Sequence, residues 1–75
     1  MAKLPIVSGA EAVKALKRLG FVVDRQRGSH VVLKKVTLGG VSGCVIPMHR
    51  EVALGTLRSA LKMAGVTAEE FIDAL

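Results

Sequence analysis

The chain has 75 residues, with eleven Lys and Arg against six Asp and Glu and a net charge of +5. This length excludes a second domain of ordinary size, because domains usually need about 50–200 residues, so we expect one domain over residues 1–75. It also excludes a large enzyme with a deep cofactor cleft. Hydrophobic residues make up 51% of the chain and the mean hydropathy is +0.47, which excludes an intrinsically disordered protein.

Cellular location is indicated by three simple features. Cys44 is the single cysteine and cannot form an internal disulfide. Residues 1–12 contain no apolar run of the length that a signal peptide needs, and no run approaches the roughly 20 residues that span a bilayer. We therefore expect a cytoplasmic protein without a membrane segment. An isoelectric point near 10.0 favours an anionic partner, nucleic acid above all, although a charge that serves only solubility fits the composition equally well.

A first helix is predicted after Ser8. Ser8 and Glu11 have the spacing of a capping box, apolar residues then recur every three or four positions, and Gly20 ends the pattern. The opposite face of this helix carries Lys14, Lys17 and Arg18.

Three strands are predicted next. The first covers residues 21–23 and becomes polar over 24–26, and a turn follows at residues 27–29. The second covers residues 30–35, with Val31 and Leu33 on one face and His30, Val32 and Lys34 on the other. A loose, glycine-rich connection over 36–43 leads to a third strand at 44–46, which Pro47 ends.

Two helices are predicted in the last third. Leu54, Leu57, Leu61 and Ala64 share one helical face, and Gly65 stops that helix. A second capping box, Thr67 with Glu70, begins a short final helix anchored by Phe71, Ile72 and Leu75. This order predicts an α+β fold of two layers, with a three-stranded antiparallel sheet and the helices on one face.

The charge is unevenly distributed along the chain. All eleven basic residues and three of the acidic ones lie within residues 1–64, whereas residues 65–75 carry Glu69, Glu70 and Asp73 and no base. Phe21 and Phe71, the two aromatic residues, both fall at apolar anchor positions, so neither is free to stack on a base. This disfavours single-strand readers that depend on exposed aromatic rings.

Few residues are candidates for chemistry. Cys44 lies in an apolar strand, which favours a buried, inert thiol. The two histidines and the cysteine lack the spacing of a zinc site, so no metal is expected. The glycines of residues 38–43 lack the Gly-Lys-Ser/Thr ending of a phosphate loop, and Asp24 is isolated from other carboxylates.

His30 is the main candidate. The strand alternation places it with Lys34, close to Arg25, Arg27 and Lys35. Imidazole exchanges protons near neutrality, so His30 beside a bound phosphodiester suits RNA cleavage through the 2′-hydroxyl, with cations stabilising the phosphoryl oxygens. A strand-end histidine without a role fits the residues equally well. His49, in the loop after Pro47, is a second proton-transfer group or a phosphate contact, although loop histidines more often bond backbone.

A family resemblance rests on several segments together. They are Leu16–Phe21 (LKRLGF), Arg25–His30 (RQRGSH), Val45–His49 (VIPMH), Gly55–Leu61 (GTLRSAL), Ala64–Val66 (AGV) and Glu70-Phe71. The Gly-Ser-His element, the later Pro-x-His and the Gly-Thr-Leu resemble the HicA family of mRNA interferase toxins. The connection over residues 35–43 is longer and richer in glycine than this family's pattern.

The resemblance implies a fold similar to the double-stranded RNA-binding domain and an endoribonuclease that cleaves mRNA without a cofactor. It also implies that His30 is the catalytic residue and that a HicB-type antitoxin blocks the site. With the basic strand residues, it suggests RNA contacts at Arg25, Arg27, Gly28, Ser29, Lys34 and His49.

Two other hypotheses fit the sequence. One is a double-stranded RNA-binding module without catalysis, for which the helix–sheet–helix order and the basic helix faces are suitable. The other is a pure interaction domain whose positive surface binds an acidic protein. His30 distinguishes the enzyme from both, because neither needs it.

Overall fold

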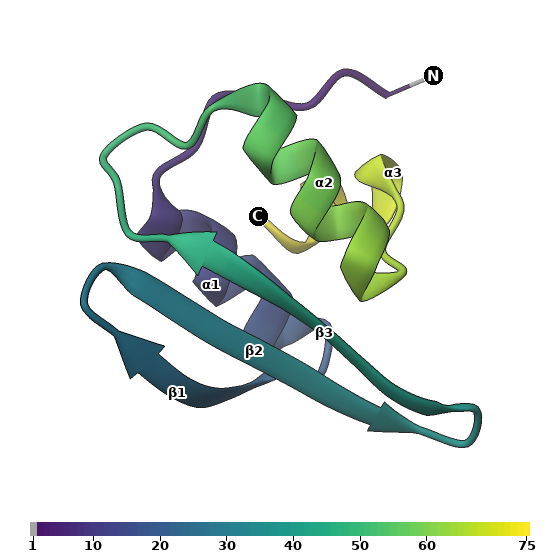
Figure 1. Ribbon diagram of the computed structural model, residues 1–75. Coiled ribbons are helices and arrows are strands. Elements are labelled where there is room, and N and C mark those ends of the chain that lie inside the picture. Colours follow the sequence, from purple (N-terminus) through teal and green to yellow (C-terminus); the bar gives the residue numbers. More distant parts are fainter. Residues whose placement is uncertain (1) are drawn as a thin grey trace.

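A computed structural model describes residues 2–75. The elements in chain order are α1 (Gly9–Arg18), β1 (Val22–Arg27), β2 (His30–Thr37), β3 (Gly40–Pro47), α2 (Leu54–Ala64) and α3 (Ala68–Ala74). The strands form one antiparallel sheet in the order β1-β2-β3. The expected α+β fold is therefore confirmed, and Figure 1 shows α1 behind the strands, so that the opposite face of the sheet is open.

Both predicted capping boxes are present. The Ser8 hydroxyl accepts the Glu11 backbone N–H at 3.1 Å, and the Glu11 carboxylate accepts the Ser8 N–H at 2.9 Å. Thr67 and Glu70 repeat this arrangement at the start of α3. Each box satisfies backbone donors that a helix N-terminus leaves free, which explains why both helices begin where the sequence indicates.

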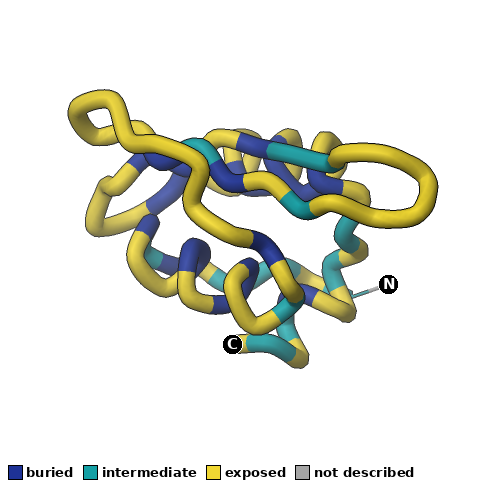
Figure 2. Tube along the Cα trace, turned by 90° about the horizontal axis from the view of Figure 1, so that it is seen from below, coloured by how far each residue is buried: buried dark blue, intermediate teal, exposed yellow. Residues whose placement is uncertain are grey.

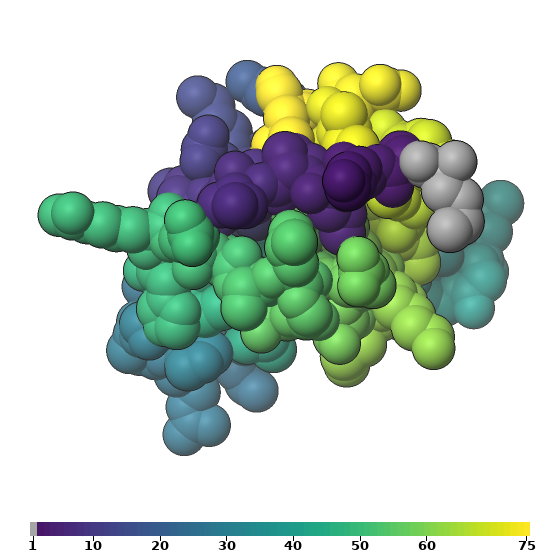
Figure 3. Space-filling model, turned by 90° about the horizontal axis from the view of Figure 1, so that it is seen from above, coloured from purple at the N-terminus to yellow at the C-terminus, as the bar shows by residue number. Residues whose placement is uncertain are grey.

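One apolar cluster lies between the sheet and the helices. Val31 and Leu33 of β2 and Cys44 and Ile46 of β3 face it, as the alternation predicts. Its largest fully buried side chains are Phe71, Leu16, Leu33, Ile46, Leu57 and Val52. The N-terminal arm closes the cluster: Val7 is buried, its carbonyl accepts the Val52 N–H at 2.9 Å, and Figure 3 shows the arm in purple between α2 and α3.

The predicted loose connection over residues 36–43 was wrong. β2 continues to Thr37 and β3 begins at Gly40, with Val36 paired to Val41 and a turn at Leu38-Gly39 between them. Gly40 has a φ of 129°, which glycine adopts without strain and which lets the chain reverse tightly. The valines and Thr37 favour extended backbone, so the ladder extends to the turn. This turn lies at the right of Figure 2 and is exposed along its length.

Three smaller expectations also need correction. β1 runs from Val22 to Arg27 and does not end at residue 23, because a register shift at Asp24 lets the polar residues continue the pairing. Leu54 and Leu75 were expected in the core but are 40% and 41% exposed. Each lies at or just beyond the end of a helix, where the turn that would cover it is missing.

Candidate functional site

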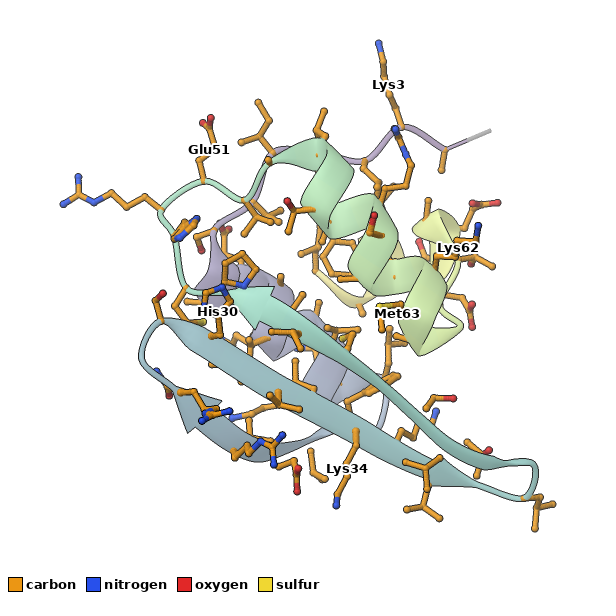
Figure 4. All side chains as sticks on the ribbon, in the orientation of Figure 1. Lys3, His30, Lys34, Glu51, Lys62 and Met63 are labelled. Atoms are coloured by element: carbon orange, nitrogen blue, oxygen red, sulfur yellow. The ribbon has the colours of Figure 1, made fainter. Side chains whose placement is uncertain are left out.

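His30 is the first residue of β2 and lies at one end of the sheet. It is exposed, and its neighbours in the ladder are Arg27 of β1 and Pro47 of β3. Cross-strand partners project from the same face, and this face is opposite to the one that buries Val31. Figure 4 shows His30 beside the end of β3, on the open side of the sheet.

The turn that precedes His30 is fixed from two sides. Gly28 has a φ of 58°, in the left-handed region that suits glycine. The Gln26 side-chain amide donates to the Gly28 carbonyl at 3.0 Å, and the Met48 N–H donates to the Ser29 carbonyl at 2.6 Å. These bonds fix the position of the backbone at His30. No pattern in the sequence indicates the roles of Gln26 and Met48.

The loop that carries His49 lies at the same end of the sheet. The Gly9 N–H donates to the His49 carbonyl at 2.8 Å, so the first residue of α1 is bonded to this loop. A Cβ atom on Gly9 would lie 2.7 Å from the Met48 Cα and closer still to the Pro47 carbonyl oxygen. Gly9 therefore allows an approach that no other residue permits. The backbone of His49 is held near the turn before His30, while its side chain is exposed.

Two arginines share the open face with His30. Arg25 is paired with Val32 and Arg27 with His30, and both arginines are exposed. The salt bridge found within residues 2–75 joins Lys34 to Asp24 instead, with 3.0 Å between Nζ and Oδ1. The register shift between Val23 and Arg25 brings Asp24 beside Lys34, so this carboxylate has a cation as its partner. Arg25 and Arg27 are therefore better placed than Lys34 to contact an anion.

Lys35 does not belong to this group. Successive side chains of a strand point to opposite faces, so Lys35 projects toward the helices while Lys34 projects from the open face. Its ammonium donates to the Leu19 carbonyl at 2.7 Å and lies 5.8 Å from the centre of the Phe21 ring. It supports the end of α1, and the expectation that it stands beside His30 was wrong.

The other candidates from the sequence have structural explanations. Cys44 is 2% exposed and burial raises the pKa of its thiol, so it stays protonated and inert near neutrality, as predicted. The glycines of residues 38–43 lie in a turn and in β3, with no helix directly after them. Among residues 2–75, no three His, Cys, Asp or Glu side chains come together as metal ligands, and none of the helices there is long and apolar enough to cross a membrane.

The arrangement suits an anionic polymer better than a small molecule. His30 and the two arginines lie on an open strand face, which leaves room for an extended ligand. Cations beside an imidazole can neutralise a phosphate and exchange a proton with it. Gly9 belongs to this site because its backbone bonds to the loop of His49. Its close approach to Pro47 and Met48 is visible only in the fold, and no pattern in the sequence marks it.

Comparison with known proteins identifies the family of the chain. No curated protein sequence matches the chain. The model of the family described as HicA toxin of bacterial toxin–antitoxin matches residues 9–66, which include α1, the whole sheet and α2. The match contains both the turn before His30 and the loop of His49. The chain therefore belongs to the HicA family of bacterial toxins.

Proposed function

We propose that this toxin is a cytoplasmic, metal-independent endoribonuclease that cleaves mRNA, uses His30 for proton transfer and is neutralised by a HicB-type antitoxin. The toxin role follows from the family. The observation that supports the chemistry is an exposed histidine paired with Arg27 on an open face, directly after a turn whose carbonyls are both hydrogen-bonded. The whole chain, residues 1–75, acts as one domain in this proposal.

The reaction needs no group beyond the RNA and the protein. Neutral His30 accepts the proton of a ribose 2′-hydroxyl, and the 2′-oxygen attacks the adjacent phosphorus. The bond from phosphorus to the 5′-oxygen breaks, and that oxygen takes up a proton. The products are a 2′,3′-cyclic phosphate and a 5′-hydroxyl end, so atoms and charge balance.

The neighbouring residues have separate roles in this proposal. Arg27 and Arg25 stabilise the charge that develops on the phosphoryl oxygens. Gly28 and Ser29 keep the backbone close to the ribose–phosphate chain, and Lys34 contacts a more distant phosphate. His49 is the candidate donor of the proton to the leaving 5′-oxygen, since its loop is bonded to the turn before His30.

Replacing His30 with alanine tests the proposal. We expect His30→Ala to reduce RNA cleavage by about 10²–10⁴-fold and to abolish growth arrest, because general acid–base catalysis contributes about that much. The fold is expected to persist, since the side chain is exposed. Cleavage by the wild type should be unchanged by EDTA.

The matched control is Arg58→Ala, which removes an exposed cation from α2. It should cleave RNA as the wild type does. A folded His30→Ala protein that is as active and toxic as the wild type would contradict the assignment.

A double-stranded RNA-binding module without catalysis is the second candidate. The α1-β1-β2-β3-α2 order, with α1 behind the sheet and α2 packed against β3, favours it. Such modules recognise duplex shape, phosphates and 2′-hydroxyls. Tight duplex binding in a gel-shift assay, with no cleavage product after long incubation, would favour this function over the ribonuclease.

A further inference from the structure

The β2–β3 hairpin carries an exposed apolar group at its end. Val36 and Val41 are ladder partners that are 74% and 69% exposed, and Leu38 in the turn is fully exposed. We call Val36, Leu38 and Val41 the hairpin tip. The alternation along β2 and β3 places both valines on the open face, the same face as His30.

The hairpin tip extends beyond the rest of the sheet. The pairing of β1 with β2 stops at Val22 and Lys34, whereas β2 and β3 remain paired to Thr37 and Gly40. Residues 35–42 are therefore a two-stranded ribbon, which Figure 1 shows projecting away from the helices. Such ribbons are marginal in water unless something packs on them. This apolar surface is thus available to a partner.

RNA does not explain this surface. Residues 36–43 contain no charged side chain, so they offer no cation to a phosphate. Aliphatic side chains also provide no ring on which a base can stack. Val45, which is 43% exposed, and the half-buried Val32 add apolar surface nearer to His30, and the pair of Lys34 and Gly43 separates them from the tip. The open face therefore has a basic side, formed by Arg25 and Arg27 of β1 and Lys34 of β2, and an apolar side at the hairpin tip.

We propose that the hairpin tip is the anchor for the antitoxin, an acidic protein that buries apolar side chains on Val36, Leu38 and Val41 and directs carboxylates to Arg25 and Arg27. This proposal rests on the proposed function, in which a protein partner neutralises the toxin. An occupant that spans the open face must match both its sides, and carboxylates next to apolar groups do so. A second copy of this chain that met this face with its own open face would oppose Arg25 and Arg27 with the same arginines, and like charges disfavour that arrangement.

The anchor gives the antitoxin an advantage that RNA lacks. RNA binding through cations weakens steeply as salt increases, because each phosphate contact releases counterions. Apolar burial is not screened by salt, so the complex with the antitoxin should keep more of its affinity. The hairpin tip thus separates the two ligands of the open face: substrate uses the His30 end alone, and the antitoxin uses both.

The test uses the full chain and the protein encoded by the adjacent reading frame. The triple variant Val36→Thr, Leu38→Thr, Val41→Thr keeps branched side chains at the strand positions and removes their apolar character. We expect its binding to that protein to weaken at least about tenfold, as for central apolar contacts of an interface. Its RNA cleavage should be unchanged, and in cells it should remain toxic when the antitoxin is co-expressed.

Controls make each outcome decisive. Ile6→Thr removes a branched apolar group of similar exposure, 65%, from the N-terminal arm and should bind as the wild type does. Leu38→Thr alone tests the tip without changing a strand residue, and it should weaken binding in a protein with unchanged thermal stability. Unchanged binding by Leu38→Thr and the triple variant would overturn the proposal. So would self-association of the wild type that the triple variant abolishes, which would assign the tip to a second copy.

The proposed ribonuclease activity can fail separately. His30→Ala is predicted to lose cleavage and to keep antitoxin binding, whereas the hairpin variants are predicted to keep cleavage and lose binding. If no form of the protein cleaves RNA, the binding titration still shows whether the hairpin tip contributes to the affinity for the antitoxin. The two proposals are therefore distinguishable in the same set of proteins.

Discussion

At the His30 end of the sheet, hydrogen bonds from other parts of the chain hold the backbone, whereas at the hairpin tip the hydrogen bonds described within residues 2–75 stay inside the hairpin. Met48 bonds to the turn before His30, and Gly9 bonds to the loop after β3. Within residues 36–41 the ladder and the bond from the Thr37 hydroxyl to the Gly40 carbonyl, 3.2 Å long, both stay inside the hairpin. The first end is basic, and residues 36–43 are uncharged and largely apolar on the open face.

This difference fits the two tasks that we propose. A group that exchanges protons with a substrate must be held within about 0.5 Å of its productive position, and backbone bonds from other segments provide that rigidity. A docking surface has no such requirement, because the partner orders it on binding. The open face thus combines a rigid end for chemistry with a projecting end for recognition.

Two truncations in β2 give the largest expected contrast. Leu33→Ala removes a fully buried side chain and should reduce the free energy of unfolding by about 2–5 kcal/mol. Val36→Ala, in the same strand, should change it by no more than about 0.5 kcal/mol, because this side chain lies on the exposed tip. Urea denaturation of both variants measures the difference. Equal losses would mean that the tip is packed in solution.

Two glycine substitutions sharpen the comparison at the His30 end. Gly9→Ala forces the backbone of α1 away from Pro47 and Met48, and overpacking of this kind should cost about 1–3 kcal/mol of stability and reduce RNA cleavage with it. Gly55→Ala, in α2, meets no atom within 4 Å and should instead stabilise the protein by up to about 1 kcal/mol. Thermal unfolding and cleavage assays report both effects. A Gly9→Ala protein with unchanged stability and activity would show that the contact does not position the loop.

The smallest effect concerns the capping box at the start of α1. Hydrogen bonds with Ser8, first of all the one from its backbone N–H, lower the pKa of Glu11 below 4.5 in the folded protein. The charged carboxylate therefore stabilises the fold above the unfolded pKa, and this contribution disappears as the pH falls through the lowered value. Glu11→Gln should be less stable than the wild type at pH 7 and equally stable at about pH 2–3.

The melting temperature measured at both pH values tests this prediction. Glu51→Gln, in the exposed loop before α2, is the control and should show no such pH-dependent difference. If the melting temperature of Glu11→Gln stays below that of the wild type by the same amount in acid, the charged capping interaction is contradicted.

Local signals in the sequence were enough for most of the elements. Ser8 with Glu11 and Thr67 with Glu70 marked two helix starts, and the apolar alternation in β2 assigned Val31 and Leu33 to the core. The same alternation placed His30 and Lys34 on the open face. The cluster of basic residues did not predict the position of Lys35, because the strand period puts it on the opposite face from Lys34, where it bonds to Leu19.

The sequence by itself determined the features that depend on neighbours a few residues apart. They are the helix caps, the periodicity of apolar residues in helices and strands, the glycines that end helices, and the motif around His30 that resembles the family. The tertiary structure alone decided which distant segments meet. It brought Met48 to Ser29, Gly9 to Pro47 and Lys35 to Leu19, and it extended the ladder so that Val36 and Val41 became an exposed pair. The physical reason is that each of these contacts involves a backbone group or the length of a paired strand. Every residue except proline carries the same backbone groups, so the identity of a single residue specifies neither which backbone group it meets nor how far two strands pair.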